Sequence, residues 1–190
     1  MTRFICIGGK AQNGKTTLAT MLKEKLESNG KKVLLTNYAD LLKFMCREYF
    51  GWNGKKDDAG RTMLQNIGTE VVRARKPNFW VDFVIDTVSL FPQEWDYVVI
   101  GDTRFPNEIS RIAEKGYDVA FVRIVRPLFN NALTEDQQKH KSETALDSVS
   151  ADYTVINDKT LDILKGKATE LCRRIAEDGG RHTPAGVDGA

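Results

Sequence analysis

A ten-residue stretch near the start of the chain, GGKAQNGKTT at residues 8–17, has the residue types that hold a phosphate chain. Gly9 and Gly14 are separated by four residues and followed by Lys15 and Thr16, the spacing of a nucleoside-triphosphate phosphate loop. In such a loop, backbone N–H groups form a concave nest, and the N-terminus of the next helix adds positive charge. We therefore predict ATP binding by Gly9, Asn13, Gly14, Lys15, Thr16 and Thr17.

A phosphate loop of this type works with a metal ion. The Thr16 hydroxyl is expected to ligate Mg²⁺, while Lys15 reaches the β- and γ-phosphates of ATP. The second metal position is expected from an acid at the end of another buried strand, and DYVVIGD at residues 96–102 ends in Asp102. Capping of a helix or turn is the alternative role for Asp102. We predict a site for Mg²⁺ at Thr16 and Asp102, with ATP as phosphoryl donor.

Several arginines could bind the group that receives the phosphate. A monophosphate is a dianion, and the guanidinium fork matches its oxygens. Arg61 and Arg73 lie twelve positions apart in a predicted helical segment, so they project in similar directions if that helix is unbroken. Arg104 follows Asp102 and is expected near the transferring phosphate. For each arginine, a solvated surface position is the alternative.

Four other side chains are candidates for acceptor binding. Gln65 could read a base edge with its amide, and Trp80 could stack on a base, although aromatics at this spacing also build cores. Asp40 could orient the acceptor, act as a base, or cap the helix that follows it, and Lys43 lies one turn further on. An ionised phosphate oxygen needs no strong base, whereas a hydroxyl acceptor usually benefits from one, so Asp40 bears mainly on a hydroxyl acceptor.

The elements that must position these residues follow from hydrophobic patterning. Short apolar runs predict strands at residues 4–8, 32–36, 96–102, 118–125 and 152–158, and helical patterns occupy 15–28, 38–50, 61–75, 79–91, 105–116 and 160–177. A strand, phosphate loop, helix and strand in succession open a parallel α/β fold. We predict a three-layer P-loop kinase fold with a five-stranded parallel sheet, a helical acceptor-binding insertion and a lid.

This fold divides into functional segments. A single domain covers residues 1–177, with an acceptor-binding region at 37–95, in which the polar stretch at 51–60 reads as a mobile loop, and a lid region at 123–148. The lid is expected to exclude water and to bring Arg123 and Arg126 toward the γ-phosphate. The glycine-rich residues 178–190 are expected to be a disordered tail.

Composition limits the classes of partner. A net charge of +2 is too balanced to argue for bulk nucleic-acid or membrane binding. The three cysteines are widely separated, as in a reducing compartment, and no apolar run is long enough to span a membrane. The N-terminus leads straight into the first strand, so no cleavable signal is expected. These features predict a cytoplasmic protein without a membrane partner, and they leave a homodimer open.

The motifs together resemble the bacteriophage deoxynucleoside monophosphate kinases, a branch of the P-loop nucleoside monophosphate kinases. The matching pieces are GGKAQNGKTT, YADLLK, LQNIGTEVVR, GDTRFPNE, HKSE at residues 140–143 and DYTVIND at 152–158. The resemblance implies transfer of the γ-phosphate of Mg-ATP to a deoxynucleoside 5′-monophosphate for dNTP supply, in the host cytoplasm if the chain is phage-encoded. The candidate catalytic residues are Lys15, Asp40, Arg104 and Arg126.

Two alternatives remain at this stage. A P-loop kinase could phosphorylate the hydroxyl of a modified base, such as 5-hydroxymethyluracil, in phage DNA; the near-neutral charge argues against a DNA partner, while Asp40 and the basic stretch GWNGKK at 51–56 favour it. A non-catalytic nucleotide-binding switch is the second, although Lys15, Thr16 and Asp102 together favour catalysis. The HKSE segment has no physical role that the sequence explains.

Overall fold

The computed structural model describes residues 2–127, 129 and 133–179. Its centre is a five-stranded sheet in the order β2-β3-β1-β4-β5, in which every pairing is parallel. The five strands and the parallel arrangement confirm the expected fold class. The strands are β1 (Arg3–Gly8), β2 (Val33–Thr36), β3 (Tyr97–Thr103), β4 (Asp118–Val125) and β5 (Tyr153–Ile156).

The strand order determines where a ligand can bind. The chain leaves β1 toward β2 on one side of the sheet and later reaches β4 on the other side, so β1 lies at the switch point between β3 and β4. Open parallel sheets bind ligands outside the carboxyl ends of their strands at such a point. At this end Gly8 of β1 lies opposite Thr103 of β3 and Arg123 of β4.

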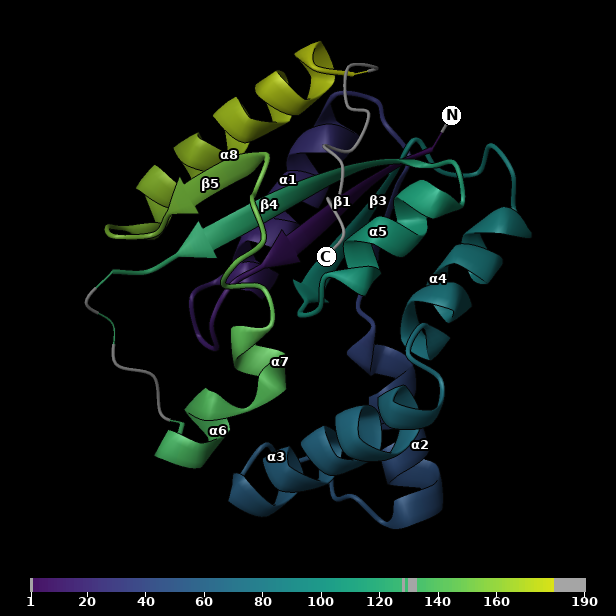
Figure 1. The fold of residues 1–190 in the computed structure, drawn as a ribbon. Coiled ribbons are helices and arrows are strands. Elements are labelled where there is room, and N and C mark those ends of the chain that lie inside the picture. Colours follow the sequence, from purple (N-terminus) through teal and green to yellow (C-terminus); the bar gives the residue numbers. More distant parts are fainter. Residues whose placement is uncertain (1, 128, 130–132, 180–190) are drawn as a thin grey trace.

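Helices cover both faces of the sheet and make three layers (Figure 1). On one face lie α1 (Lys15–Ser28) and α8 (Leu161–Glu177), and on the other lie α4 (Phe79–Ser89) and α5 (Asn107–Glu114). Within β1, alternate residues serve alternate faces: Ile5 and Ile7 belong to the cluster under α1 and α8, whereas Phe4 and Cys6 belong to the cluster under α4. All four are fully buried, as expected of a central parallel strand.

The helices between β2 and β3 extend beyond the carboxyl edge of the sheet. They are α2 (Ala39–Phe50), α3 (Asp58–Gln65) and the π-helix η1 (Asn66–Arg73), and they form the lower part of Figure 1. The expected single helix at 61–75 is therefore an α-helix that continues as a π-helix. Gly68 does not break it. A Cβ there would lie 2.7 Å from Cδ2 of Leu42, so this glycine lets η1 pack closely against α2.

The loop between α2 and α3 was expected to be mobile, but specific contacts hold it. Trp52 is buried, and its indole N–H donates to the Lys55 carbonyl at 2.9 Å. The Asp57 carboxylate caps α3 by accepting from the Gly60 N–H at 2.9 Å. Arg61 Nε donates to the Lys56 carbonyl at 3.0 Å. Lys56, whose carbonyl takes part in these bonds, lies within electrostatic range of Lys43, Arg61 and Arg104.

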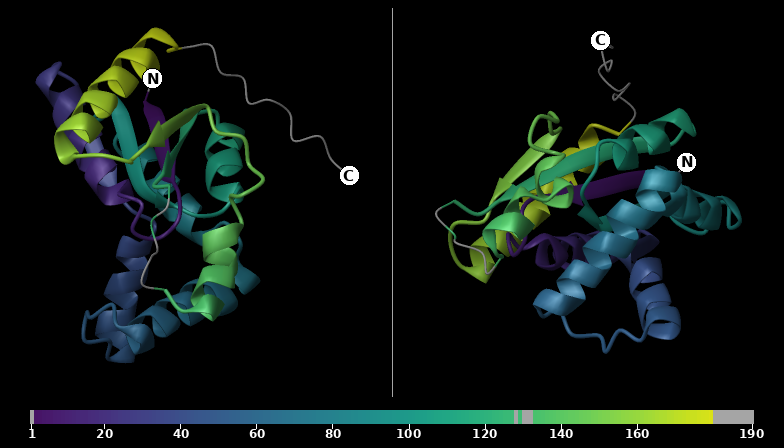
Figure 2. Two further views of the ribbon diagram at one scale, coloured as in Figure 1. Left: turned by 90° about the vertical axis from the view of Figure 1, so that its left-hand side faces the viewer. Right: turned by 60° about the horizontal axis from the view of Figure 1, so that its bottom comes forward.

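The segment between β4 and β5 contains α6 (Glu135–Lys139) and α7 (Lys141–Thr144), which lie between the sheet and the insertion helices (Figures 1 and 2). Arg123, expected to serve the γ-phosphate, instead donates Nη2 to the carbonyls of Leu146 (2.8 Å) and Val149. The end of the expected lid is thereby fastened to β4. Positions 128 and 130–132 of that lid, and 180–190 of the expected disordered tail, fall outside the described residues. Across the described residues, we find no helix with the length and apolarity of a membrane span.

Candidate active site

The phosphate loop connects β1 to α1, and its two key glycines are required by space as well as backbone angle. Gly9 has φ 148° and Gly14 has φ 99°, a region that favours glycine. A Cβ on Gly9 would lie 2.3 Å from the Ile124 carbonyl oxygen, and one on Gly14 would lie 2.7 Å from Nδ2 of Asn157. Asn13 Nδ2 donates to Ile124 O at 3.2 Å, so β4 and the end of β5 shape the loop.

Lys15 begins α1 and is buried. Its Nζ donates to the carbonyls of Gly9 at 2.7 Å and Lys10 at 2.8 Å, which places the ammonium on the loop. Burial and the positive charge of Arg104 lower the pKa of Lys15 to about 7, against the opposing charge of Glu143. A phosphate chain in the loop would supply the negative charge that this lysine needs. Thr16 and Thr17 follow with exposed side chains in the first turn of the helix.

Asp102 has the capping role that was the alternative to metal binding. Its Oδ1 accepts from the Tyr38 N–H at 2.8 Å and its Oδ2 from the Ala39 N–H at 3.0 Å, so it caps the start of α2. Burial raises the pKa of its carboxyl group, although these hydrogen bonds act in the opposite direction. Each carboxylate oxygen keeps a second lone pair, which a cation could use.

The side chains beside the phosphate loop suit a Mg²⁺ ion that takes most of its ligands from a bound nucleotide and water. The described part of the chain contains no group of three or more His, Cys, Asp or Glu side chains that could cage a metal ion. Mg²⁺ usually binds through one or two carboxylates together with substrate phosphates and water. An exposed Thr16 hydroxyl beside the loop and the Asp102 carboxylate at the end of β3 match that kind of donor set.

Arg104 follows Asp102 by two positions and lies beside the loop. Its Nη1 donates to the Ser142 carbonyl at 3.0 Å and forms an ion pair with Glu143. The other Glu143 oxygen accepts from the Ala11 N–H of the phosphate loop at 2.8 Å. The Arg104 backbone N–H donates to Glu108 Oε2 at 2.7 Å. The guanidinium is therefore connected to the loop through one shared carboxylate.

A cluster of positive side chains surrounds this point. Lys56 is exposed at the surface, but partial desolvation lowers its pKa, and the like charges of Lys43, Arg61 and Arg104 lower it further. Lys56 in turn contributes to the low pKa of Lys15. We call Lys43, Lys56, Arg61 and Arg104 the cationic cluster. Lys56 was not identified as a site residue from the sequence, because only folding of the loop brings it near Arg104. The pair of lysines in GWNGKKDDAG was the feature that could have indicated it.

Asp40 is held as an ionised partner of the cluster. Its carboxylate accepts from Lys43 Nζ at 2.8 Å and from Asn37 Nδ2 at 3.0 Å. Burial alone would raise the pKa of Asp40, but these hydrogen bonds prevail and lower it. Since α2 begins at Ala39, Asp40 lies in its first turn and is not the cap.

Two expected substrate residues are placed elsewhere. Trp80 is 4% exposed, and its indole N–H donates to the Gly68 carbonyl at 3.0 Å, so no ring face is open for a base. Arg73 forms an ion pair with buried Glu108 at 2.5 Å and stacks on the Phe105 ring. Twelve residues make about three and a third turns of an α-helix, so the expectation that Arg61 and Arg73 project in similar directions was wrong. Arg61 instead donates to the Lys56 carbonyl, whereas Arg73 turns to Glu108. We leave Trp80 and Arg73 out of the site.

Gln65 and Arg126 are the two remaining candidates. Gln65 lies one helical turn after Arg61 on α3, so the two side chains share a face. Arg126 directly follows β4 and is exposed, with its guanidinium 4.0 Å from the centroid of the Phe129 ring.

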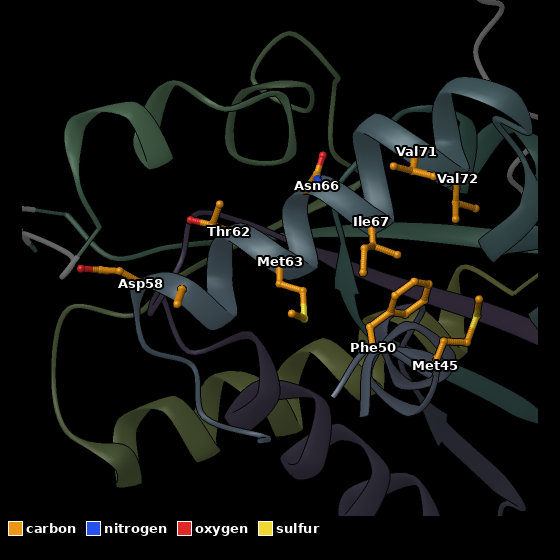
Figure 3. Close-up of a pocket in the computed structure, with 10 residues that line it drawn as sticks. Met45, Phe50, Asp58, Thr62, Met63, Asn66, Ile67, Val71 and Val72 are labelled. Carbon is orange, nitrogen blue, oxygen red and sulfur yellow. The ribbon is translucent and has the colours of Figure 1, made fainter. Parts of the chain in front are cut away.

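An apolar pocket of about 840 Å³ lies between α2, α3 and η1 (Figure 3). It is lined mainly by hydrophobic side chains, including Met45, Phe50, Met63 and Ile67. None of its lining residues belongs to the phosphate loop or to the cationic cluster. An apolar lining without cations does not suit a dianionic phosphate.

The strand order, the phosphate loop after β1 and the Lys15–Thr16 pair that opens α1 define a P-loop kinase fold. Shikimate kinase from Aquifex aeolicus VF5 superposes with a TM-score of 0.51 at 12% identity, over 93% of this chain and 99% of that one. The hexameric APS kinase from Thiobacillus denitrificans has a TM-score of 0.50 at 12% identity, over 94% of this chain and 29% of that one. At these identities, the similarity establishes the fold.

The chain belongs to the deoxynucleotide monophosphate kinase family, whose model matches residues 37–168. The matched range covers the insertion helices, the Asp102–Arg104 turn and the HKSE segment. Uncharacterized protein ORF77 of Ictalurid herpesvirus 1 (strain Auburn) is 33% identical over 102 residues, which are 53% of this chain and 42% of that protein. The match thus spans less than half the length of this viral relative.

Proposed function

We propose that this protein transfers the γ-phosphate of Mg-ATP to the 5′-phosphate of a deoxynucleoside monophosphate and releases ADP and the deoxynucleoside diphosphate. The observation that carries this proposal is that Lys56 of the insertion lies within electrostatic range of Lys43, Arg61 and Arg104 and also of Lys15 on the phosphate loop. Asp40 and Glu143 already pair with Lys43 and Arg104, but in the described part of the chain Lys15, Lys56 and Arg61 have no carboxylate partner. Added negative charge would therefore relieve their repulsion. Two phosphate groups, one from the donor and one from the acceptor, would provide that charge.

The residues would divide the work by position. The loop N–H groups and Lys15 hold the β- and γ-phosphates, and Arg104 faces the group in transfer. Bound at Thr16 and Asp102, Mg²⁺ would supply neutralisation of phosphate charge. Lys43, Lys56 and Arg61 bind the acceptor phosphate, Gln65 contacts the base from the same helix face, and Arg126 approaches from the end of β4. Transfer needs orientation above all, since the attacking oxygen is already ionised.

The state of Asp40 favours a phosphate acceptor over a hydroxyl acceptor. A hydroxyl of a modified base would benefit from a general base of near-neutral pKa. The pKa of Asp40 is instead lowered by its bonds to Lys43 and Asn37, which makes its carboxylate a weak base. The overall charge of +2 also gives little attraction for a DNA polymer.

The proposal is tested by ADP release from Mg-ATP in the presence of each natural and 5-substituted deoxynucleoside monophosphate, each ribonucleoside monophosphate, and duplex DNA with or without 5-hydroxymethyluracil. We expect release that depends on one or more deoxynucleoside monophosphates. Background release with every mononucleotide, together with stimulation by modified DNA, would support the DNA kinase instead. Tight ATP binding without turnover on any acceptor would support a nucleotide-binding switch.

ATP binding is expected to take up a proton above neutral pH. With a pKa of about 7, Lys15 is roughly nine-tenths neutral at pH 8, and the phosphate chain restores its charge. Free protein therefore binds fewer protons than the complex, so ATP affinity should fall by up to about tenfold per pH unit above 7. Titration calorimetry at pH 8 in buffers of different ionisation enthalpy measures the uptake. Lys15→Arg, whose guanidinium does not titrate, should show none; absent uptake in the unmodified protein contradicts the prediction.

Lys56→Ala is expected to weaken the acceptor site selectively. Loss of one charge-assisted bond to a phosphate corresponds to about 1.4 kcal/mol, or roughly a tenfold increase in the KM for the monophosphate. The KM for ATP and the melting temperature should change little, since the Lys56 side chain is exposed. Lys55→Ala is the matched control, because the neighbouring lysine is also exposed and lies outside the cationic cluster. Equal acceptor KM values for the two variants would remove Lys56 from the site.

A further inference from the structure

The HKSE segment, His140 to Glu143, contacts three functional parts of the molecule. Glu143 Oε2 accepts from the Ala11 N–H of the phosphate loop at 2.8 Å, and Oε1 pairs with Arg104. The Ser142 carbonyl accepts a second bond from the same Arg104 nitrogen at 3.0 Å. His140 Nε2 lies 3.5 Å from Glu70 Oε1 on η1. Four consecutive residues thus join the donor loop, Arg104 and the acceptor helices.

Glu143 itself is fixed in place. Its side chain is only 5% exposed. Lys10 Nζ, from the phosphate loop, donates to the Glu143 carbonyl at 2.6 Å and to the Asp147 carboxylate at 2.6 and 2.7 Å. Three residues after Glu143, the Leu146 carbonyl accepts from Arg123 Nη2 of β4 at 2.8 Å. Because the backbone on both sides is fastened to the loop and to β4, the carboxylate cannot move far from Ala11.

The contact uses only one corner of the Arg104 guanidinium. Nη1 carries both bonds, to Glu143 and to Ser142, whereas Nε and Nη2 have no hydrogen-bond partner in the described part of the chain. The side chain keeps 28% exposure. A guanidinium has five N–H donors in a rigid fork, so fixing one corner determines where the others point. Glu143 therefore orients Arg104 without occupying the donors that a phosphate needs.

We propose that Glu143 is a positioning residue that holds Arg104 against the phosphate loop, so that Nε and Nη2 face the phosphate in transfer. This inference rests on the proposed function. The carboxylate also places a negative charge between the like charges of Arg104 and Lys15, which keeps both cations near the loop before a nucleotide arrives. A glutamine has the same shape, and its amide oxygen could still accept from Ala11, but its NH₂ group would then face Arg104 and offer neither charge nor an acceptor.

Glu143→Gln is expected to lower kcat by roughly 10–100-fold, because small errors in the orientation of a reacting group cost factors of this size. The KM for ATP should change by less than about threefold and the melting temperature by only a few degrees, since the loop N–H contacts remain. Glu143→Asp, which restores the charge at shorter reach, should recover part of kcat. Glu135→Gln is the matched control: its side chain on α6 is 87% exposed, and all parameters should stay unchanged.

A double-mutant cycle separates positioning from an independent role. In an Arg104→Ala background, Glu143→Gln should cause no further loss of kcat if Glu143 acts through Arg104. Additive losses would overturn the proposal. Tighter nucleotide binding by Glu143→Gln with unchanged kcat would also overturn it, because that pattern identifies Glu143 as an obstacle to the phosphate.

A further measurement does not depend on the acceptor. A crystal structure of the unmodified protein with a non-hydrolysable ATP analogue should retain the Arg104–Glu143 pair, and the Glu143→Gln complex should show Arg104 displaced. An analogue complex in which Glu143 releases both Arg104 and Ala11 refutes the positioning role. If instead this geometry holds while no deoxynucleoside monophosphate stimulates ADP release, the proposed function fails and the positioning role stands.

Discussion

Replacing Lys15 by alanine is expected to reduce kcat by about 10²–10³-fold, the size of effect produced by removing one preorganised electrostatic contact to a transition state. The ammonium group lies on the phosphate loop, bonded to the carbonyls of Gly9 (2.7 Å) and Lys10 (2.8 Å), and it is buried. In water-excluded surroundings a positive charge acts strongly on developing negative charge. Steady-state kinetics with saturating ATP and acceptor measures the loss.

Folding should survive this substitution. Burial and Arg104 lower the pKa of Lys15, which means that its charge is unfavourable in the nucleotide-free fold. The melting temperature of Lys15→Ala is therefore expected to equal or slightly exceed that of the unmodified protein. Lys23→Ala is the matched control, because Lys23 lies on the same helix in an exposed pair with Glu27. A kcat within a few-fold of normal for Lys15→Ala would show that this lysine does not act on the transferring phosphate.

Replacing Arg104 by alanine is the second large expected effect, again about 10²–10³-fold in kcat. Arg104 follows the end of β3 and is oriented against the loop through Glu143, so its free N–H groups are placed for a phosphate. Arg104→Lys should recover only part of the activity, since an ammonium keeps the charge but loses the planar fork. Comparison of kcat with both KM values distinguishes loss of transfer from loss of binding.

Arg104→Ala should cost some stability as well. Glu143 is buried and would keep its bond from the Ala11 N–H while losing its ionic partner. A loss of about 1–3 kcal/mol in the free energy of unfolding is expected from such a group. Arg111→Ala on α5 is a suitable control, because Arg111 pairs with Asp82 and Glu114 near the surface. Near-full activity of Arg104→Ala would exclude Arg104 from phosphoryl transfer.

The sheet and its helices were readable from the sequence because their signals are local. The apolar run FICIG predicted β1, and the strand spans Arg3–Gly8. The expected helix at 15–28 is α1, and the loop between them has the glycine geometry that the motif predicted. Each of these signals depends only on residues within one helical turn or one strand. The spacing of apolar side chains and the backbone angles open to glycine therefore predict the local structure directly.

The helical insertion was only partly readable. The helical pattern at 61–75 gave no indication that its second half is a π-helix or that Gly68 packs closely against Leu42 of α2. The expected common direction of Arg61 and Arg73 failed because twelve residues are about a third of a turn out of phase in an α-helix, and Arg73 pairs with buried Glu108. Aromatic residues at the spacing of Trp80 are more often core residues than base platforms, and its burial against η1 places it in the core.

The sequence by itself determined the parallel α/β fold, the phosphate loop and the resemblance to the deoxynucleoside monophosphate kinases. The tertiary structure decided which distant residues meet at that loop. Asp102 caps α2 although Asp40 is nearer in sequence, Lys56 enters the cationic cluster, and Glu143 joins Arg104 to Ala11. These contacts join separate segments, and they form because the strand order brings the carboxyl ends of β1, β3 and β4 together. Local patterns carry no information about that order.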